Sequence, residues 1–463
     1  STDDTTPTLV GKGEPGDTII VIDNGTPIGE TEVDEDGNWS FTPDTPLGEG
    51  EHEFTVVERD PAGNESKPSD PHVVIVDKVA PTAEASITYM GKDSGIDNSD
   101  FLTNDGSAGR LLMGSLTEKL AAGEKVQVSV DGGKTWQDAL VEDNGNWVFQ
   151  DNTVHDASWT IQTRVVDEAG NCGDVVSQEV VLDTIAPLAT PISISVVGDG
   201  KQIIAELPKN AQVGDWVVFV VGDCRFYVPV YQEFLDIGKT WNVVIPSNAL
   251  EAIQSGEPIG AMFMDSAGNV SDITWMTSNI PTTEEVNIAG SGWMTDAHDT
   301  VSASAFFGTN GNDVFTLRDV EGLAGEGVFL NGNGGIDTLK LTGAGQTLDL
   351  GNTPFGLQMS SIEVFDITGT GNNTLKLSLG DVLEQGGKDL FIADGRTQVM
   401  VKGDAGDKVE LSDLLPDGGD IGDWTQQSGN TTVGGIEYDV FYHSGLNAEL
   451  LVQHGVETVL NNH

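Results

Sequence analysis

Short apolar runs recur along the chain, and turns rich in Gly, Pro, Asn and Asp separate them. Three clear runs are Thr18–Ile22, Lys125–Val130 and Trp216–Val221. Runs of this length and composition are typical of β-strands, and few segments show the 3.6-residue period of an amphipathic helix. No apolar run reaches the ~18 residues of a transmembrane helix. The pattern predicts an all-β protein without membrane insertion.

The strands belong to a module that occurs three times. Its most specific element is a D-x-A-G-N turn, found at 60–64, 167–171 and 265–269, at intervals of 107 and 98 residues. Each turn is preceded by a tryptophan 20 to 24 residues upstream and, further upstream, by a Gly-acid pair: Trp39, Trp147 and Trp241, and Gly16-Asp17, Gly123-Glu124 and Gly214-Asp215. This fixed order indicates tandem copies of one domain.

Each copy has room for roughly seven short strands in about 75–110 residues, which suits an immunoglobulin-like β-sandwich with the tryptophan in its core. Proline junctions at Val76–Pro81 and Leu182–Pro187 separate the copies. We expect three tandem sandwiches, the third divergent, and a Gly/Asp-rich β domain after them. The expected boundaries are 1–78, 79–184, 185–281 and 282–463.

Charge narrows the possible functions. The chain has 74 Asp and Glu against 21 Lys and Arg, a formal charge of −53. Nucleic acid and anionic membrane surfaces both require basic faces, so neither is an expected partner. Since 38% of the residues are hydrophobic, the chain should fold. Something must then offset the repulsion among its carboxylates.

In the C-terminal domain, Gly/Asn/Asp turns lead into apolar strands. They occur at Gly308–Phe315, Gly332–Leu339 and Gly403–Val409, each a degenerate form of the calcium-binding β-roll nonapeptide. A β-roll stacks such turns consecutively, with an ion between neighbouring coils. Here the turns are 24 and 70 residues apart, measured between their acids Asp313, Asp337 and Asp407, so the calcium signal at each is weak. Both a degenerate β-roll and a β-sandwich remain open.

The repeats resemble the bacterial immunoglobulin-like repeats of giant non-fimbrial adhesins exported by type I secretion. The likeness covers residues 1 to about 280 and is looser in the third copy, where no Gly-Asn precedes Trp241. Segments 408–415, 435–441 and 456–460 look like the repeats-in-toxin-like C-terminal region of type I secretion substrates. In that family the uncleaved C-terminus is the export signal. This fits the missing signal peptide at the N-terminus, which a truncated start would explain equally well.

Calcium is the expected cofactor, because it takes roughly six to eight oxygen ligands and the adhesin repeats are similar in binding it near their junctions. We expect Asp77 and Asp183 to clamp the junctions, with Asp60 and Asp167 completing the ligand shells. The alternative is that D-x-A-G-N is turn chemistry in a solvated acidic loop. Further candidates are Asp265 in the third turn, Asp93, Asp97, Asp100 and Asp105 in an acidic cluster of the second copy, and Asp313 and Asp337 in the C-terminal turns.

These features predict a non-catalytic, secreted or cell-surface protein: the stalk and export region of an adhesin for host-cell attachment or biofilm formation. Calcium between the sandwiches would make a monomeric rod. The expected partners are the type I secretion apparatus and a host-cell or biofilm-matrix receptor, either glycan or protein. The third copy ends in Ser278–Pro281 without a junction acid, which puts a calcium site there in doubt.

Two other functions, catalysis and ligand binding, have less support in the sequence. No H-E-x-x-H, G-x-S-x-G or complete phosphate-loop motif is present, although carboxylates are too abundant to propose or exclude a glycosidase pair. Ser129–Trp136 resembles the Asp-box of sialidases, and a single copy inside a sandwich predicts a structural hairpin. Four aromatic residues within Phe226–Phe234 could bind a glycan or a protein, as in a lectin or an enzyme tail; the alternative is that they fill a sandwich core.

Overall fold

The computed structural model describes most of the chain. The described residues are 1–95, 97–188, 195–197, 202–205, 207–221, 224–240, 243–244, 249, 252, 257–275, 285–288, 305–307, 311–320, 329–332, 334–351 and 358–463. Nearly all regular elements in them are strands, so the all-β prediction is confirmed. Within this part of the chain, no helix combines the length and the apolar character needed to span a membrane.

The first unit is a two-sheet sandwich. One sheet pairs β1 with β4, and the other has the order β3-β2-β5-β6, all antiparallel. Trp39 is buried between the sheets with Ile19, Val21 and Phe54. The strands are β1 (Leu9–Lys12), β2 (Thr18–Asp23), β3 (Thr26–Glu32), β4 (Asn38–Phe41), β5 (Gly50–Arg59) and β6 (His72–Val76).

The second unit repeats this plan with more strands. Its sheets have the orders β12-β13-β9-β7 and β11-β10-β14-β15-β8. The fully buried Trp147 packs with Val126, Ile161 and Val165. The strands are β7 (Ala85–Met90), β8 (Leu102–Thr103), β9 (Arg110–Leu116), β10 (Lys125–Ser129), β11 (Gln137–Asp138), β12 (Leu140–Val141), β13 (Asn146–Asp151), β14 (Trp159–Val166) and β15 (Val176–Leu182).

A glycine opposite the tryptophan relates the two units residue by residue. Gly11 on β1 is the register partner of Trp39, and Gly114 on β9 is the partner of Trp147. In each unit the indole ring lies over the glycine, where a Cβ would come within 2.5–2.7 Å of ring atoms. The ring therefore needs glycine at this position in order to cross the sheet.

The described residues of the third unit also form two sheets, β16-β17-β20 and β19-β18-β21-β22. Its core contains Phe219, Phe226 and Phe263. Trp241 and the end of the unit, residues 278–281, lie outside the described residues. The elements are β16 (Ser195–Val197), β17 (Gln202–Ile204), β18 (Trp216–Val221), β19 (Cys224–Pro229), α1 (Gln232–Ile237), β20 (Val243–Val244), β21 (Ile259–Met264) and β22 (Thr274–Trp275).

The C-terminal domain is a parallel β-solenoid with three sheets. Strands one coil apart pair in parallel in the orders β23-β25-β27-β30-β33-β37, β24-β26-β29 and β28-β31-β34-β38. At the C-terminal end of the first sheet, β36 and β35 add an antiparallel hairpin. A buried column of Leu, Val, Ile and Phe fills the interior. Parallel coils were expected of a degenerate β-roll, not of a β-sandwich.

The solenoid elements have the following bounds: β23 (Glu285–Ile288), β24 (Ala305–Phe307), β25 (Val314–Leu317), β26 (Phe329–Asn331), β27 (Thr338–Leu341), β28 (Thr347–Asp349), β29 (Gln358–Ser360), β30 (Val364–Asp366), β31 (Thr374–Ser378), α3 (Leu379–Gln385), β32 (Gly387–Lys388), β33 (Thr397–Lys402), β34 (Lys408–Ser412), β35 (Trp424–Val433), β36 (Ile436–His443), β37 (Ala448–Gln453) and β38 (Glu457–Asn461).

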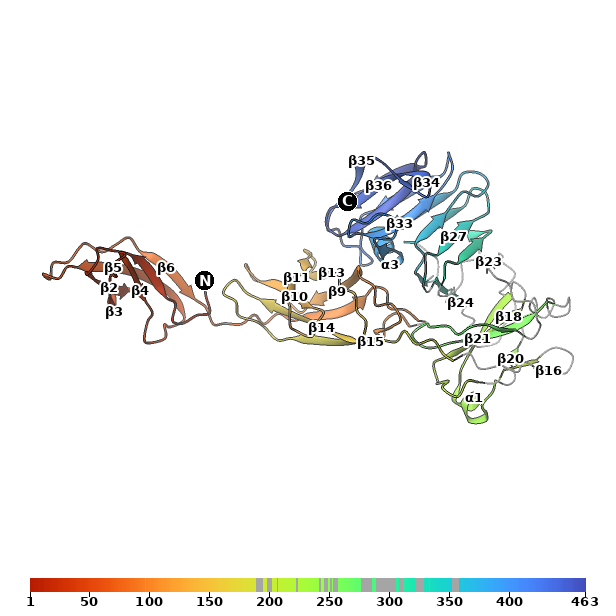
Figure 1. The fold of residues 1–463 in the computed structure, drawn as a ribbon, viewed down its shortest axis with the longest axis horizontal. Coiled ribbons are helices and arrows are strands. Elements are labelled where there is room, and N and C mark those ends of the chain that lie inside the picture. Colours follow the sequence, from red (N-terminus) through yellow and green to blue (C-terminus); the bar gives the residue numbers. More distant parts are fainter. Residues whose placement is uncertain are drawn as a thin grey trace.

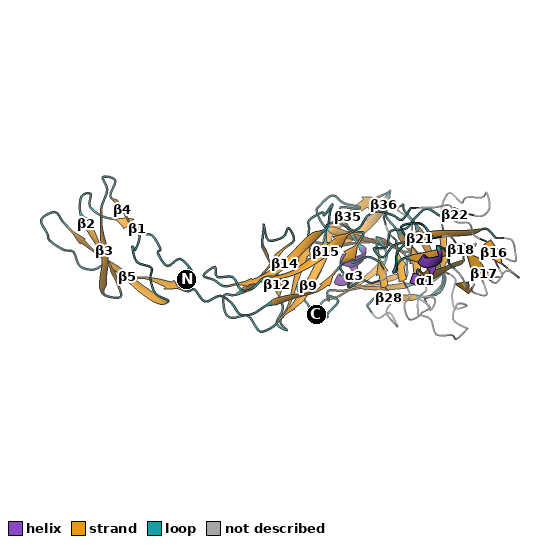
Figure 2. Ribbon diagram, turned by 90° about the horizontal axis from the view of Figure 1, so that it is seen from below, coloured by secondary structure: helices purple, strands orange, loops and turns teal. Residues whose placement is uncertain are grey.

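The units are arranged as an elongated particle with a branched end (Figure 1). The first sandwich projects at one end and joins the second through a narrow junction. Beyond the second sandwich, the third sandwich and the solenoid lie next to each other, and helix α3 of the solenoid faces the second sandwich. The extended shape persists after a 90° turn (Figure 2).

Candidate functional site

The D-x-A-G-N turns have one internal hydrogen-bond pattern. In the first, Asp60 Oδ1 accepts from the backbone N–H of Asn64 (2.8 Å) and Asp60 Oδ2 from its side-chain amide (2.7 Å). The other two turns repeat both bonds. Gly63 takes a φ of 90°, which favours glycine. The hydrogen bonds from Asn64 lower the pKa of Asp60. The aspartate therefore has a structural role, but its oxygens keep further lone pairs for a cation.

The asparagine of the turn also reaches across the junction. Asn171 Nδ2 donates to the carbonyl oxygen of Asp77 (2.9 Å), and Asn269 Nδ2 donates to that of Asp183 (2.7 Å). Each bond joins the last residues of one sandwich to the turn of the next. The turn and the junction motif therefore lie together at both junctions.

This arrangement changes the expected pairing of acids. Asp77 lies with the turn of Asp167, and Asp183 with the turn of Asp265. Asp60 lies at the opposite pole of the first sandwich, because β5 begins beside Val76 and ends beside Thr18. It therefore does not complete a shell around Asp77. The reason is strand length: β5 spans the whole sandwich and places its C-terminal turn at the far pole.

The junction between the second and third sandwiches gathers several carboxylates. Burial, together with the charges of Asp183 and Asp215, raises the pKa of Asp265 to about 6. Burial and Asp183 likewise raise the pKa of Asp215. The Gly-acid pair of the repeat thus lies beside its D-x-A-G-N turn. The same is true in the first sandwich, where burial, Glu58 and Asp60 raise the pKa of Asp17.

The acidic cluster of the second sandwich lies at this same junction. Ser94 Oγ donates to the carbonyl oxygen of Ala267 (2.7 Å), within the third D-x-A-G-N turn. Asp93 is buried, and its Oδ2 accepts from Phe101 N (3.0 Å), while its Oδ1 has no hydrogen-bond partner among the described residues. Burial, with Asp100, Glu384 and Asp97 nearby, raises the pKa of Asp93 to about 7.

Of the other acids of the cluster, Asp97 and Asp100 lie near Asp93, and Asp105 belongs to a separate group. Asp97 and Asp100 are exposed acids of the same loop, each accepting a backbone N–H two residues on. Asp105 is instead held by cations, and the charges of Lys92 and Arg110 help to lower its pKa against the opposing effect of burial. The cluster therefore divides into a group of three carboxylates and a separate ion pair.

These groups suit calcium by their chemistry. Carboxylate and carbonyl oxygens are the ligands that calcium prefers, and an unpartnered carboxylate oxygen on buried Asp93 is costly without a cation or a proton. In the described part of the chain, no three His, Cys, Asp or Glu side chains already form a metal-binding group. Any ion here would therefore need oxygens from backbone carbonyls, amides or water as well.

The turns of the solenoid form two ladders. In the first, Asp313 N donates to Asp337 Oδ1 (2.7 Å), and Asp337 N donates to Glu363 Oε2 (2.8 Å). In the second, Gln346 N donates to Asn373 Oδ1 and Asn373 N to Asp407 Oδ1, each at 2.8 Å. In both, a side chain caps a backbone N–H of the preceding coil.

The spacing of these turns in the sequence suggested that they do not stack, but the first two do. The turns of Asp313 and Asp337 are one coil apart and stack directly, because a coil here is 24 residues long. The third nonapeptide-like turn, at Gly403–Val409, belongs to the other ladder. Two members of that ladder, Gln346 and Asn373, were not predicted from the sequence. The available signal was that each is followed by a short alternating strand, Thr347–Asp349 or Thr374–Ser378.

Two motifs have structural explanations. Asp131 of the Asp-box accepts hydrogen bonds from Thr135 N (2.9 Å), Lys134 N (3.0 Å) and Ser129 Oγ (2.8 Å), and these bonds lower its pKa. The motif is therefore a structural hairpin, as predicted. In the aromatic run, Phe226 and Phe234 are buried, and Phe226 stacks on Phe219 at 5.0 Å. Tyr231 is about half exposed.

Comparison with protein families supports the first two sandwiches. Residues 1–78 and 81–184 match the family model of the bacterial Ig-like domain. Fibronectin(III)-like modules of Clostridium thermocellum CbhA are similar at 14% identity and a TM-score of 0.26, over 39% of this chain and 86% of that one. A tetra-tandem repeat from the extending region of a large adhesion protein is similar at 17% identity and a TM-score of 0.18, over 58% and 70%. The search of curated protein sequences found no match.

Proposed function

We propose that this chain is a non-catalytic, calcium-stiffened stalk and export segment of a large secreted bacterial adhesin. The observation that supports it most is the repeated junction: at both, an Asn amide of one sandwich donates to the carbonyl of the acid that ends the preceding one. A module with the same end contacts in successive copies is suited to linear extension. The family match of the first two sandwiches supports the same role.

Calcium would supply charge neutralisation and a bridge between units. At the first junction, Asp77 and Asp167 would hold it. At the second, Asp183, Asp215 and Asp265 would do so, with Asp93, Asp97 and Asp100 of the adjoining loop. An ion held by both neighbours removes the freedom of the hinge between them, and it offsets repulsion in a chain of formal charge −53. Attachment to a host-cell or biofilm-matrix receptor and export by type I secretion belong to the same proposal.

Small-angle X-ray scattering tests the clamp at the first junction, where the first sandwich projects alone. We expect the wild-type chain to show a longer, less flexible particle in calcium than in chelator. The variant Asp77→Asn should stay flexible in calcium, because it lowers the ligand charge while an amide oxygen can still accept from Val79 N.

The matched control is Asp70→Asn, an equal change of charge at an exposed residue of the same sandwich. It should respond to calcium as the wild type does. Identical wild-type profiles in calcium and chelator would contradict calcium stiffening, whatever the variants do.

A further inference from the structure

The outer face of the second sandwich is buried against the solenoid. Leu111 and Met113 on β9 and Val148 on β13 are 2%, 6% and 1% exposed. They belong to the same hydrophobic cluster as Phe315, Val382 and Leu383 of the solenoid. Two units separated in sequence by the third sandwich therefore share one apolar core.

The equivalent face of the first sandwich is exposed to solvent. The Gly-Trp pairs align the two units, so that Val10 and Ser40 of the first correspond to Met113 and Val148 of the second. Val10 is 74% exposed and Ser40 is exposed as well. The copies thus differ at the positions that touch the solenoid, as expected for a face adapted to a permanent neighbour.

Polar contacts surround this apolar patch. Glu384 of α3 accepts from Tyr89 OH (3.1 Å) and Lys92 N (3.0 Å). On β13, Gln150 Oε1 accepts from Asn447 N (2.9 Å). At the rim, Asn146 Nδ2 donates to Asp417 Oδ2 (2.8 Å).

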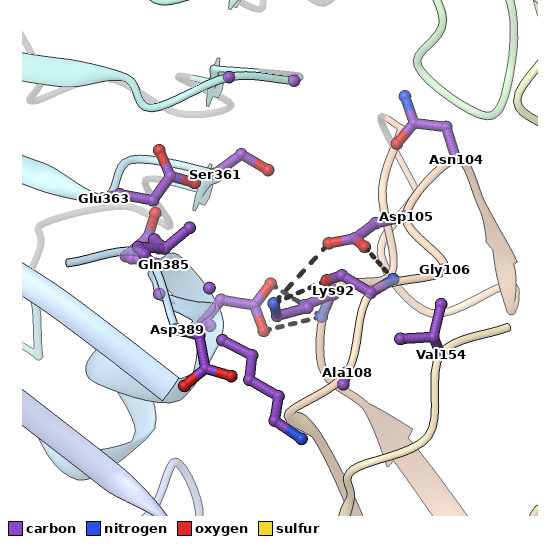
Figure 3. A pocket seen from close by; sticks show the side chains of 18 of the residues that line it. Lys92, Asn104, Asp105, Gly106, Ala108, Val154, Ser361, Glu363, Gln385 and Asp389 are labelled. Atoms are coloured by element: carbon purple, nitrogen blue, oxygen red, sulfur yellow. Dashed lines mark hydrogen bonds and ion pairs between the residues drawn. The ribbon is translucent and has the colours of Figure 1, made fainter. Parts of the chain in front are cut away.

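A cavity of about 660 Å³ adjoins the contact. Lys92 lies between the two walls and points toward Asp105, with Glu363 and Gln385 on the solenoid side (Figure 3). Its ammonium donates to Ser107 Oγ (3.0 Å) and lies 3.9 Å from Asp105 Oδ2. An apolar centre with a polar rim is the usual anatomy of a specific interface.

Chain connectivity gives this contact a mechanical meaning. The second sandwich ends near Asp183 and the core strands of the solenoid begin near Val314, so the third sandwich lies within the loop that the contact closes. Tension applied at residues 1 and 463 has two parallel routes between these units. One runs directly through the shared core, and the other runs through the third sandwich and its connections.

We propose that docking of the second sandwich on the solenoid transmits tension past the third sandwich, which stays unloaded until this interface opens. The proposal rests on the stalk role only in that a stalk bears load. The third sandwich is then a reserve of length: its 97 expected residues (185–281) would release roughly 340 Å of chain once loaded and unfolded.

Single-molecule force spectroscopy on the full chain, held at both termini, tests this order of events. A Gly-Ser insertion after the exposed turn residue Asn210 lengthens only the third-sandwich step and so identifies it. In the otherwise unaltered chain, that step should always follow a separate opening step. In Met113→Asp it should appear first and at lower force, because a charge in the apolar centre opens the interface. Val10→Asp, the same change at the matching exposed position, should behave as the unaltered chain does.

A second variant avoids the risk that Met113→Asp unfolds its sandwich. Asn146→Cys with Asp417→Cys, in a Cys172→Ser and Cys224→Ser background, should be joined within the chain by a short bismaleimide cross-linker, and the cross-link should abolish the third-sandwich step. Failure of this pair to cross-link, or a third-sandwich step without prior opening in the unaltered chain, would overturn the proposal. Neither result depends on calcium stiffening, which the scattering experiment tests separately.

Discussion

A buried carboxylate in the solenoid should make its stability fall as pH rises. Asp337 is fully buried; its Oδ1 caps Asp313 N, and no described residue forms a hydrogen bond with its Oδ2. Burial, with Glu363 and Asp313 nearby, raises the pKa of Asp337 from 3.8 to about 8. The folded state therefore binds this proton more tightly than the unfolded state does. The contribution of Asp337 to the free energy of unfolding is therefore highest below about pH 4, and it is lost as pH rises through 8.

The size of the effect follows from the shift. About four pKa units at ~1.4 kcal/mol each set an upper bound of about 6 kcal/mol. Local relaxation of the structure and the electrostatic interaction with Glu363 reduce this bound. We therefore expect the free energy of unfolding to fall by about 2–4 kcal/mol. Asp337→Asn removes the charge and keeps an oxygen to accept from Asp313 N. The stability of the variant should match that of the wild type below about pH 4, exceed it as pH rises, and differ most above pH 8.

Hydrogen–deuterium exchange measures this locally. In chelator at pH 8.5, after correction for intrinsic exchange rates, the peptide 311–320 should be roughly 30- to 700-fold more protected in Asp337→Asn than in the wild type. The control Asp404→Asn changes an exposed turn acid of the same domain and should have little effect. Equal protection in Asp337→Asn and the wild type at pH 8.5, or weaker protection in the variant, would refute the argument.

Two further predictions concern the second sandwich. Gly114→Ala would place a Cβ against the Ser86 carbonyl oxygen and 2.7 Å from the Trp147 ring, so thermal unfolding should show a loss of about 1–3 kcal/mol or more. The control Gly48→Ala lies in the first sandwich, where a Cβ would have no described atom within 4 Å, and it should be nearly neutral. Asp131→Ala removes the acceptor of the Asp-box hairpin and should cost about 1–3 kcal/mol in chemical denaturation without altering calcium affinity, whereas a change in affinity would point to a ligand role.

The sequence predicted the features that depend on local chemistry. Strand content, the tryptophan cores and the structural Asp-box hairpin all follow from residues close together in the chain. The pairing of Asp77 with the turn of Asp167 could not be predicted, because it depends on which pole of the sandwich the end of β5 reaches. The stacked turns were missed because the length of a solenoid coil is set by loops that carry no fixed pattern.

The docking of the second sandwich on the solenoid could not be predicted from the sequence either. Leu111, Met113 and Val148 suit a sandwich strand of any orientation, and only the comparison with Val10 and Ser40 shows that they belong to an outer face. That comparison needs the Gly-Trp register, which is a cross-strand property. Future comparison of tandem copies should therefore align them by paired positions as well as by motif.

The ladders of the solenoid give its assembly a direction. Because each cap comes from the coil that follows, a turn gains its capping hydrogen bond only when its C-terminal neighbour is in place. Growth should then proceed backward from the hairpin of β35 and β36, each finished layer serving as the template for the one before it. A chain that emerged tail first would present its layers in the order in which they can be added.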